Sequence, residues 1–536
     1  MHRVFEISLI LSIAGLSVFS CAQKQQKEQR PNILFIMSDD HACKAISAYG
    51  YGLNETPNID RLASEGAIFD RATVTNSICA PSRAVILTGK HSFVNGKVDN
   101  KQPFEWDQPS FPKLLQANGY QTALIGKIHL DGVPRGFDFS MVLPGQGYYY
   151  NPDFIVDGDS IRIEGYVTEI ITETTLDWLK NKRDPDKPFC LLYQQKAPHG
   201  NWQPAPKYLT LYNDITYDPP SNFFDNYEGR GTAAREQTLE LHTHARWGHV
   251  FKMLIDPNGD TTSFNRHFQR MNQDQRANWL AAYEDEDQKF LANMPKGKEL
   301  ALWKYNRYIR DYLRTVQSVD DGVGELLNYL DEAGLAENTV VVYTSDQGLF
   351  LGEHGWWDKR FMYEESFRIP LLMQYPKEIK PGTTIRNLVQ NLDFAPTFLD
   401  YADIEIPDYI QGRSFRKLVA GETDEWRDAV YYTYYEYPGA HAVKRHYGIA
   451  TDRYKLMHFY YDIDEWEMYD LKEDSMEMNN IYGDPAYGVV QEMLHTRLEE
   501  LRKHYGDSDE LSDKLLKSYL DSEEGRKWKK ILLQQR

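Results

Sequence analysis

The sequence contains few cysteines, no excess of basic residues and a single long apolar run. Four cysteines among 536 residues are too few for a disulfide-based scaffold. The 60 Lys and Arg residues face 79 Asp and Glu residues, and the net charge of −19 excludes broad binding along nucleic acid. An anionic ligand would therefore need a local cationic pocket. Hydrophobic residues make up 41% of the chain, which is enough to bury a large core and excludes a disordered protein.

The apolar run, Ile7–Phe19, lies at the N-terminus. It is shorter than the roughly 20 residues that span a bilayer, and it is typical of a signal peptide. Residues 1–20 are therefore predicted to be a lipoprotein-type signal peptide with Cys21 as the lipidated residue, followed by a polar tether over residues 21–30. Phe19 is unusual in that pattern, which leaves simple secretion as an alternative. We expect an exported bacterial protein, periplasmic or on the cell surface, that contacts the membrane only through this anchor.

Strands and helices alternate along much of the remaining chain. Continuous apolar runs that end in polar residues predict buried parallel strands. The expected strands are Asn32–Met37, Gln121–Ile125, Phe189–Gln194 and Thr339–Tyr343, with helices at Asn58–Glu65 and up to Leu114–Gly119. This alternation predicts an α/β fold with a mixed, largely parallel sheet flanked by helices.

Polar residues directly follow several of these strands. They are Asp39, Asp40, Lys127, His129, His199, Asp346 and Gln347. Each group alone would more often be an ordinary loop. Because the carboxyl ends of parallel strands form the ligand crevice of an open α/β sheet, four groups at equivalent positions favour one shared site.

The rest of the chain divides into an insertion and a C-terminal region. Residues from about 200 to 310 form the insertion, with helices expected near Ala233–Trp247 and Asp274–Asp285. After Gly412, four segments alternate as antiparallel strands do: Ala429–Tyr435, Tyr447–Thr451, Lys455–Tyr460 and Trp466–Leu471. A closing helix is expected at Val489–His504, its apolar face formed by Val490, Met493, Leu494, Leu498 and Leu501. We therefore predict a catalytic domain over residues 31–412 and a smaller C-terminal subdomain, with an antiparallel sheet and a helix, over residues 413–536.

The sharpest motif is Cys79-Ala80-Pro81-Ser82-Arg83, followed by Leu87-Thr88-Gly89. It resembles the C-x-P-S-R-x-x-x-L-T-G signature of the type I sulfatases, and the resemblance extends to about His504. It implies an alkaline-phosphatase-like fold and conversion of Cys79 to formylglycine by a sulfatase-maturing enzyme. The hydrated aldehyde would use one oxygen to attack and the other to expel sulfate, which is a form of covalent catalysis. A lone cysteine is otherwise a buried structural thiol, as we expect for Cys43 and Cys190.

The same resemblance implies a metal site. Ser38-Asp39-Asp40 and Ser345-Asp346-Gln347-Gly348 are similar to the two metal-binding segments of the family. The implied ligands are Asp39, Asp40, Asp346 and Gln347, completed by the formylglycine made from Cys79. Oxygen-only ligation favours Ca²⁺ over Zn²⁺. Many relatives have Asn or His where this chain has Gln347.

Three further segments resemble catalytic elements of the family: Gly126-Lys127-Ile128-His129, Ala197-Pro198-His199 and Trp357-Asp358-Lys359-Arg360. The resemblance implies that Arg83 and Lys127 hold the diol and the sulfate oxygens, and that His129 takes a proton from the diol. It also implies that His199 and Lys359 bind sulfate and protonate the departing sugar oxygen, because a sugar alkoxide leaves poorly without a proton. Which histidine has which role stays open.

The segments Asp346–Pro370 and Lys196–Gln203 look most like those of bacterial N-acetylglucosamine-6-sulfatases. This resemblance implies exo-acting 6-O-desulfation of N-acetylglucosamine in heparan-type or mucin-type glycans. The expected contacts to the sugar are Asp358, Arg360 and His458, although a packing role for His458 is equally compatible with the sequence. A sugar-facing wall of Trp202, Trp356 and Trp357 is a further hypothesis, and packing is the alternative.

Three other functions remain open at this point. The enzyme could act on another sulfated sugar. Phosphatases and phosphonate hydrolases share the implied architecture, but they use Thr or Ser as nucleophile and usually bind two transition-metal ions. The third alternative, a non-catalytic glycan-binding lipoprotein, has no support in the sequence because the expected nucleophile, metal ligands and basic residues are all present.

Overall fold

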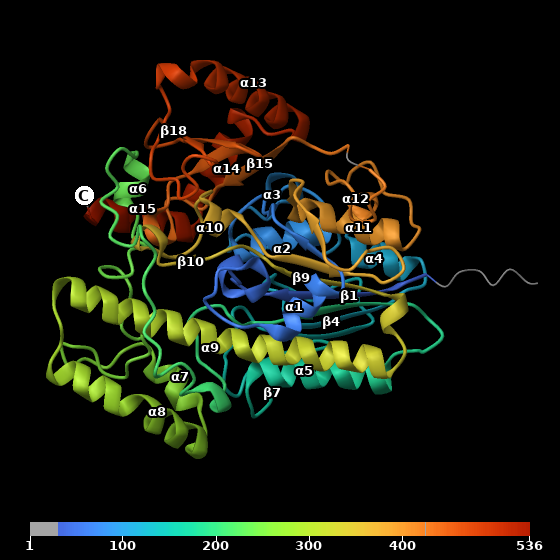
Figure 1. Cartoon of the computed structure of the whole chain (residues 1–536), viewed down its shortest axis with the longest axis horizontal. Helices are drawn as coiled ribbons and strands as arrows, with labels where there is room; N and C mark the ends of the chain where they lie inside the picture. The colour runs from blue at the N-terminus through green and yellow to red at the C-terminus, as the bar shows by residue number, and fades with distance from the viewer. Residues whose placement is uncertain (1–29, 424, 536) are drawn as a thin grey trace, which may run out of the picture.

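The computed structural model describes residues 30–423 and 425–535 (Figure 1). The signal peptide, the lipidated Cys21 and most of the tether are predicted for residues outside these ranges. Within the described ranges, no helix combines the length and apolar character that crossing a membrane requires.

A mixed sheet forms the centre of the molecule. In the described part of the chain ten strands pair in the order β13-β2-β12-β9-β1-β8-β4-β5-β6-β7. The middle strands β9, β1, β8, β4 and β5 are parallel to one another. Strand β12 pairs antiparallel with β9, and β6 pairs antiparallel with β5. The strands run over Thr383–Ile385, Ala67–Phe69, Leu371–Gln374, Thr339–Ser345, Asn32–Ser38, Phe189–Gln194, Gln121–Lys127, Phe139–Leu143, Asp153–Val156 and Asp159–Arg162 in that order. The four strands expected from the sequence and the largely parallel sheet are confirmed.

Helices cover both faces of this sheet, because side chains of a buried strand alternate between two apolar layers. On β1, Phe35 belongs to the core under α2 (Cys79–Thr88), α4 (Phe111–Ala117) and α11 (Phe394–Tyr401). Its ring centroid lies 5.2 Å from that of Phe398. The neighbouring Leu34 belongs to the core under α1 (Pro57–Ser64), α5 (Val167–Asp177) and α9 (Gly297–Glu332). Figure 1 shows α5 and α9 on one side of the sheet and α2, α4 and α11 on the other.

The insertion differs in part from its prediction. Helix α8 (Gln273–Ala292) contains the expected helical segment and begins with a capping box between Asn272 and Gln275. Of the helix expected at Ala233–Trp247, only the first part is present, as α6 (Thr232–Glu236). The rest of that prediction is wrong. Residues 239–241 pair with residues 355–357 instead, because Leu241 N donates to Gly355 O at 2.8 Å and Trp357 N donates to Leu239 O at 3.0 Å, and two turns follow. The insertion also contains α7 (Asn265–Arg270).

A second, smaller sheet lies in the C-terminal region. Within the described residues it has four antiparallel strands, β15 (Ala429–Tyr434), β16 (His446–Thr451), β17 (Tyr454–Phe459) and β18 (Glu465–Asp470), as expected. Helix α13 (Gly488–Tyr505) packs on one face through Leu494, Leu498 and Leu501. The predicted apolar face of α13 is too wide, since Met493 is 51% exposed.

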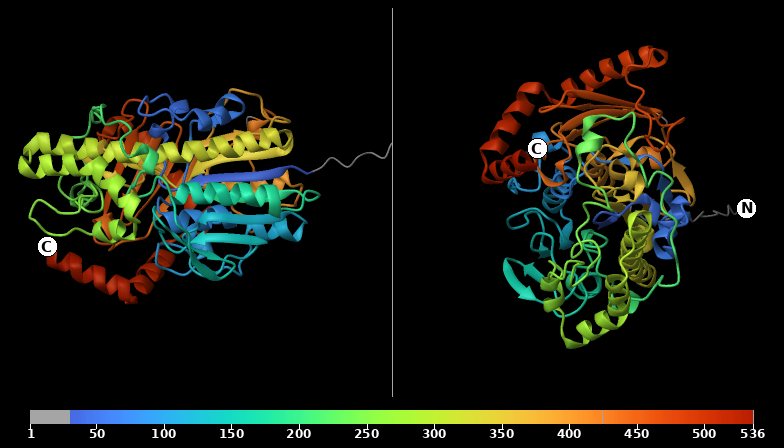
Figure 2. Two further views of the ribbon diagram at one scale, coloured as in Figure 1. Left: turned by 90° about the horizontal axis from the view of Figure 1, so that it is seen from below. Right: turned by 90° about the vertical axis from the view of Figure 1, so that its left-hand side faces the viewer.

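Two more helices, α14 (Asp509–Asp521) and α15 (Glu523–Gln535), follow α13. In the right-hand view of Figure 2 the red C-terminal helices lie at one end of the molecule and the yellow-green helices of the insertion at the other. The boundary between residues 31–412 and 413–536 stays a prediction.

Candidate active site

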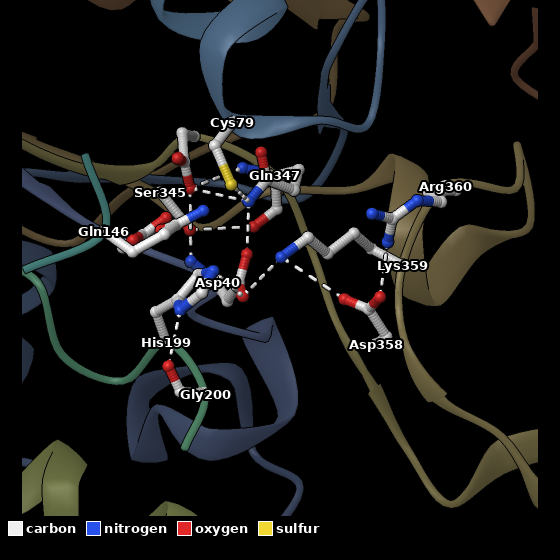
Figure 3. A network of polar contacts seen from close by, with 12 residues as sticks. Asp40, Cys79, Gln146, His199, Gly200, Ser345, Gln347, Asp358, Lys359 and Arg360 are labelled. Carbon is white, nitrogen blue, oxygen red and sulfur yellow. Dashed lines mark hydrogen bonds and ion pairs between the residues drawn. The ribbon is translucent and has the colours of Figure 1, made fainter. Parts of the chain in front are cut away.

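The carboxyl ends of β1, β4 and β9 meet at the N-terminus of α2. Asp39 and Asp40 follow β1, Lys127 ends β4, and Asp346 follows β9. Cys79 is the first residue of α2 and is buried. Figure 3 shows Cys79 directly above Gln347, with Asp40, His199 and Lys359 around it. The shared site expected at this edge of the sheet is thus brought together from six separate segments of the chain.

Three carboxylates lie at the bottom of the site. Asp39, Asp40 and Asp346 are all fully buried or nearly so. Burial, followed by the charge of Asp39, raises the pKa of Asp346 to about 8, and burial also raises the pKa of Asp40. Burial favours the neutral form of Asp39 as well, but the nearby Lys127 and His199 hold its pKa well below the usual value.

The arrangement around these carboxylates fits a hard divalent cation. Gln347 Nε2 donates to Asp40 and, at 2.9 Å, to Asp346 Oδ1, and it lies 3.6 Å from Cys79 Sγ. Within the described residues, Asp39 Oδ1 and Gln347 Oε1 are buried without a hydrogen-bond partner. Potential ligand atoms of Asp39, Asp40, Cys79 and His199 all lie within 4.8 Å of one another. Oxygen donors of this kind suit Ca²⁺ or Mg²⁺, and a cation would offset the repulsion among the carboxylates.

Arg83 bridges two of the carboxylates, Asp39 and Asp346. Its Nε donates to Asp346 Oδ2 at 2.8 Å, and its NH2 lies 3.5 Å from Asp39 Oδ1. Its NH1 donates to Lys127 O at 2.5 Å and to Gln194 Oε1 at 3.1 Å. The guanidinium therefore fixes two of the carboxylates, and its expected contacts with the diol and the sulfate oxygens stay a prediction.

Two lysines contact the carboxylates of the cluster. Lys127 Nζ donates to Asp39, while Lys359 Nζ lies 2.6 Å from Asp40 Oδ2 and 3.3 Å from Asp358 Oδ1. Burial works against the charge of Lys359, yet Asp40 keeps its pKa well above the usual value. The ammonium group of Lys359 is therefore a positive charge held beside Cys79.

The position of Lys127 depends on the glycine before it. Gly126 has φ +112°, and a Cβ there would lie only 1.8 Å from Gln194 O on the neighbouring strand β8. Only glycine allows this close approach and this backbone conformation. The last residue of β4 can therefore turn into the site.

The two histidines expected in the site are both present. His199 Nε2 lies 3.7 Å from Asp40 Oδ2, and its Nδ1 contacts Gly200 O at 2.7 Å. His129 Nε2 lies 3.3 Å from Gln146 Nε2, and its Nδ1 is buried without a partner among the described residues. Burial, followed by the charge of Lys127, lowers both pKa values well below 6.5. Both rings are neutral at pH 7 in this state.

Cys79 as a thiol is a poor nucleophile. Burial raises its pKa above the ordinary range, in spite of the nearby charge of Lys359. Since the thiolate is the reactive form, an unmodified Cys79 would be inert at neutral pH. Cys43 and Cys190 are buried free cysteines, as expected.

Asp358 and Arg360 form a buried polar group beside Lys359. Arg360 NH1 donates to Asp358, and its NH2 lies 3.6 Å from Glu436 Oε1. His441 Nε2 lies 2.9 Å from Asp358 Oδ2. Arg360 also lines a cavity of about 320 Å³ together with His129, Gln146, Glu436, Tyr519 of α14 and Trp528 of α15. Two of the three residues expected to contact a sugar, Asp358 and Arg360, therefore lie beside the catalytic cluster.

His458 lies elsewhere, and its expected place in the site is wrong. Its ring stacks on Trp466 at 4.1 Å, and Nε2 lies 2.7 Å from Asp464 Oδ1. Neighbouring Leu456 packs toward α13, whereas Met457 and Phe459 face the main core. Because side chains alternate along a strand, His458 points away from the site.

The three tryptophans expected as a sugar-facing wall are mainly packing residues. Trp202 lies with its ring centroid 4.9 Å from that of Tyr308, and Trp356 lies 5.0 Å from Phe361. Both are buried. Trp357 alone among the three borders a cavity, which it shares with His441.

Sequence reasoning missed four polar residues of the site: Gln146, Lys196, Glu436 and His441. Gln146 accepts from Lys127 Nζ and lies between two glycines with positive φ, 56° and 64°. A polar residue in a Gly-Gln-Gly turn was a usable signal. Lys196 immediately precedes the Ala197-Pro198-His199 motif, and Glu436 and His441 follow β15.

Comparisons with known proteins agree with this geometry. A family model described as Sulfatase matches residues 31–404, and one described as N-sulphoglucosamine sulphohydrolase, C-terminal, matches residues 352–504. The N-acetylglucosamine-6-O-sulfatase of Bacteroides thetaiotaomicron is 51% identical over 94% of this chain and 92% of its own length.

Solved structures show the same fold. A protein solved in complex with its substrate D-glucosamine-2-N,6-O-disulfate is 51% identical, with a TM-score of 0.88 over 90% of this chain and 99% of the other. A phosphonate monoester hydrolase from Silicibacter pomeroyi, 21% identical, has a TM-score of 0.64 over 89% of this chain and 96% of its own, so the fold alone does not distinguish the two activities. The family match and the close relative do distinguish them. This chain belongs to the sulfatase family.

Proposed function

We propose that this sulfatase hydrolyses the 6-O-sulfate ester of glucosamine units, most specifically N-acetylglucosamine, in heparan-type or mucin-type glycans. The observation that carries the proposal is Cys79 at the start of α2, enclosed by three carboxylates and two lysines. The identity of 51% to an N-acetylglucosamine-6-O-sulfatase supports the choice of sugar.

Formylglycine at position 79 is part of this proposal, and it requires a sulfatase-maturing enzyme as a partner. The raised pKa of the buried thiol supports it, because Cys79 itself would stay protonated. When hydrated, formylglycine supplies one hydroxyl for attack and a second for release of sulfate.

Calcium is the proposed metal. Asp39, Asp40, Asp346 and Gln347 would hold it. The supporting observation is that, among the described residues, Asp39 Oδ1 and Gln347 Oε1 are buried without a hydrogen bond. A bound Ca²⁺ supplies a positive charge that stabilises the sulfuryl oxygens.

The remaining steps belong to residues of this chain. Lys127 and Lys359 are placed to hold sulfate oxygens on either side of position 79. His129 is neutral and has a buried Nδ1 without a partner, which fits a group that accepts a proton. His199 faces Asp40. A bound sulfate would add negative charge beside the ring and favour its protonated form. The protonated ring is placed to donate a proton to the departing sugar oxygen.

The sugar would occupy the cavity of about 320 Å³ beside Arg360. Asp358 and Arg360 orient each other and offer charged hydrogen bonds to ring hydroxyls or the N-acetyl group. Trp528 of α15 is half-buried at the far side, where its Nε1 donates to Glu524 Oε1 at 2.7 Å. Its ring is a candidate surface for packing of the sugar.

The location is part of the proposal as well. Residues 1–20 would direct export, and Cys21 would carry a lipid anchor in the periplasm or on the cell surface. The sequence of Ile7–Phe19 supports export.

Positional specificity tests the function directly. Matured protein should release sulfate from N-acetylglucosamine 6-sulfate at least about tenfold faster than from the 3-sulfate or from galactose 6-sulfate. Equal rates, or release from galactose 6-sulfate alone, would leave a sulfatase with a different sugar.

A further inference from the structure

The side chain of Asn100 lies between the start of α2 and the cavity of about 320 Å³ beside Arg360. Its Oδ1 accepts a hydrogen bond from Ala80 N at 3.2 Å. The first N–H groups of a helix have no partner within the helix, and Ile78, the cap residue of α2, has no side-chain acceptor. Asn100 therefore supplies, from 20 residues further along the chain, the acceptor for the residue directly after Cys79.

This hydrogen bond fixes the orientation of the Asn100 amide. A backbone N–H can only donate, so the atom that faces Ala80 is the amide oxygen, and the amide nitrogen lies on the other side of the group. Among the described residues, no acceptor lies within hydrogen-bond distance of this Nδ2. Since Asn100 also lines the cavity, its unused donor is available to a molecule bound there.

A carboxyl group that can accept a hydrogen bond lies next to this donor. Asn100 N donates to Glu436 Oε2 at 3.1 Å, and Glu436, which is 8% exposed, lines the same cavity. Burial raises the pKa of Glu436, although the charge of Arg360 acts in the opposite direction. In either protonation state the carboxyl group has an oxygen that accepts a further hydrogen bond.

Most other polar side chains that line this cavity are already used within the protein. Gln146 accepts from Lys127, and Tyr519 OH donates to Pro438 O at 2.7 Å. The Asn100 amide and the Glu436 carboxyl group therefore remain as a neighbouring donor and acceptor for a ligand.

We propose that Asn100 and Glu436 bind the 2-acetamido group of the substrate, with Asn100 Nδ2 donating to its carbonyl oxygen and Glu436 accepting from its N–H. An acetamido group presents one donor and one acceptor on two separate atoms, and the two side chains complement both. The proposal rests on the proposed function, because it places the 6-O-sulfate of the same sugar in the catalytic cluster. Asp358 and Arg360 then bind the ring hydroxyls.

Kinetics with two substrates test the preference. N-acetylglucosamine 6-sulfate and glucose 6-sulfate differ only at C2, and kcat/KM of the matured enzyme for the first should be at least about tenfold higher. Asn100→Asp keeps an oxygen for Ala80 N, where the start of a helix favours negative charge, but it loses the donor. The ratio of the two kcat/KM values should fall toward one. The added charge acts on the 6-O-sulfate of both substrates alike, so the ratio is the readout.

Asn272→Asp is the matched control. Asn272 also holds a backbone N–H at the start of a helix, because its Oδ1 accepts from Gln275 N at 2.9 Å. Its Nδ2 donates to Glu164 Oε1 at 2.9 Å, and it does not line the cavity. This variant should keep the wild-type ratio.

A crystal structure tests the contact without turnover and without a change at Asn100. Cys79→Ala protein has no nucleophile and can be soaked with N-acetylglucosamine 6-sulfate. The acetamido oxygen should lie about 3 Å from Asn100 Nδ2, and the acetamido nitrogen about 3 Å from an oxygen of Glu436.

Any of three results would overturn the proposal. They are equal kcat/KM values for the two substrates in the wild type, a folded Asn100→Asp variant that keeps the wild-type ratio, and an acetamido group bound away from Asn100 in the crystal structure. If matured protein releases sulfate from neither compound, the proposed function fails. A crystal structure with N-acetylglucosamine alone then still decides whether Asn100 binds the acetamido group.

Discussion

Lys359 Nζ lies 2.6 Å from Asp40 Oδ2, and this ion pair joins the cationic side of the site to the carboxylates below Cys79. Lys359 comes from the loop after β11 (Trp357–Asp358), while Asp40 follows β1, more than 300 residues earlier in the chain. The pair is almost completely buried. One side chain can therefore both neutralise a carboxylate and present a positive charge to a sulfate.

Replacing this lysine should affect catalysis more than binding. In Lys359→Met a preorganised positive charge beside the reacting sulfate is lost, and kcat should fall by about 10²–10³. Steady-state kinetics on N-acetylglucosamine 6-sulfate, with the thermal midpoint as a check on folding, measure this. A folded variant that retains kcat would remove Lys359 from the catalytic group.

Arg360 should matter mainly for binding of the sugar. Its guanidinium faces the cavity next to the catalytic cluster, so Arg360→Gln should raise KM by about ten- to a hundredfold through loss of a charged hydrogen bond. His458→Gln is the matched control, because His458 stacks on Trp466 at the opposite face of the small sheet. A KM that rises in the His458 variant instead would contradict this placement of the sugar.

Gly126 should tolerate no side chain. Gly126→Ala places a Cβ 1.8 Å from Gln194 O at a φ of +112°, so the variant should lose at least about 2 kcal/mol of stability and most of its activity. Gly382→Ala is the control: its φ is +73°, but no atom lies within 4 Å of the added Cβ, and its loss should be about 1 kcal/mol. Urea unfolding of both variants checks the difference, and equal losses would show that the contact with β8 is not what requires glycine.

The dependence of stability on pH can be predicted for Asp311 on α9. Burial alone would raise its pKa, but Lys252, Arg314 and Arg307 hold the pKa well below the usual value. Lys252 Nζ lies 2.7 Å from Asp311 Oδ2. A carboxylate with a depressed folded pKa contributes stability that is complete above its unfolded pKa of roughly 3.9 and is lost as the pH falls below it.

Asp311→Asn should therefore cost about 3–5 kcal/mol at pH 7, because it leaves buried cations without a partner. Because burial lowers the pKa of Lys252 to about 8, the cost should stay constant only between about pH 7 and pH 5, and it should begin to shrink below about pH 4. Urea unfolding at several pH values measures it. A cost that instead shrinks as the pH rises from 5 to 7 would mean that Lys252 loses its proton in that range.

The core of the site could be predicted from the sequence because its residues lie next to recognisable strands and motifs. Asp39, Lys127 and Asp346 each follow an apolar strand, and the edge of a parallel sheet brings such residues together. Cys79 belongs to a motif of five adjacent residues. In these places local sequence and tertiary position are tightly linked.

The residues that escaped prediction come from loops. Gln146, Glu436 and His441 reach the site through turns whose path depends on distant contacts, such as Tyr519 OH donating to Pro438 O at 2.7 Å. The helix expected up to Trp247 failed for a similar reason, since backbone pairing of Leu239 and Leu241 with residues 355–357 replaced helical hydrogen bonds. His458 was misplaced because the sequence does not reveal which face of a small sheet is turned toward the site.

The central claim is that Cys79, after maturation, releases 6-O-sulfate with the help of a bound cation. The most direct measurement is free sulfate released from N-acetylglucosamine 6-sulfate by protein produced together with a sulfatase-maturing enzyme, with conversion of Cys79 verified by mass. We expect release that vanishes in Cys79→Ala, is lost with a chelator and returns with Ca²⁺ but not Zn²⁺. Undiminished release by Cys79→Ala would contradict the account. So would strong hydrolysis of phosphate esters when Zn²⁺ is added to protein from which a chelator has removed the metal.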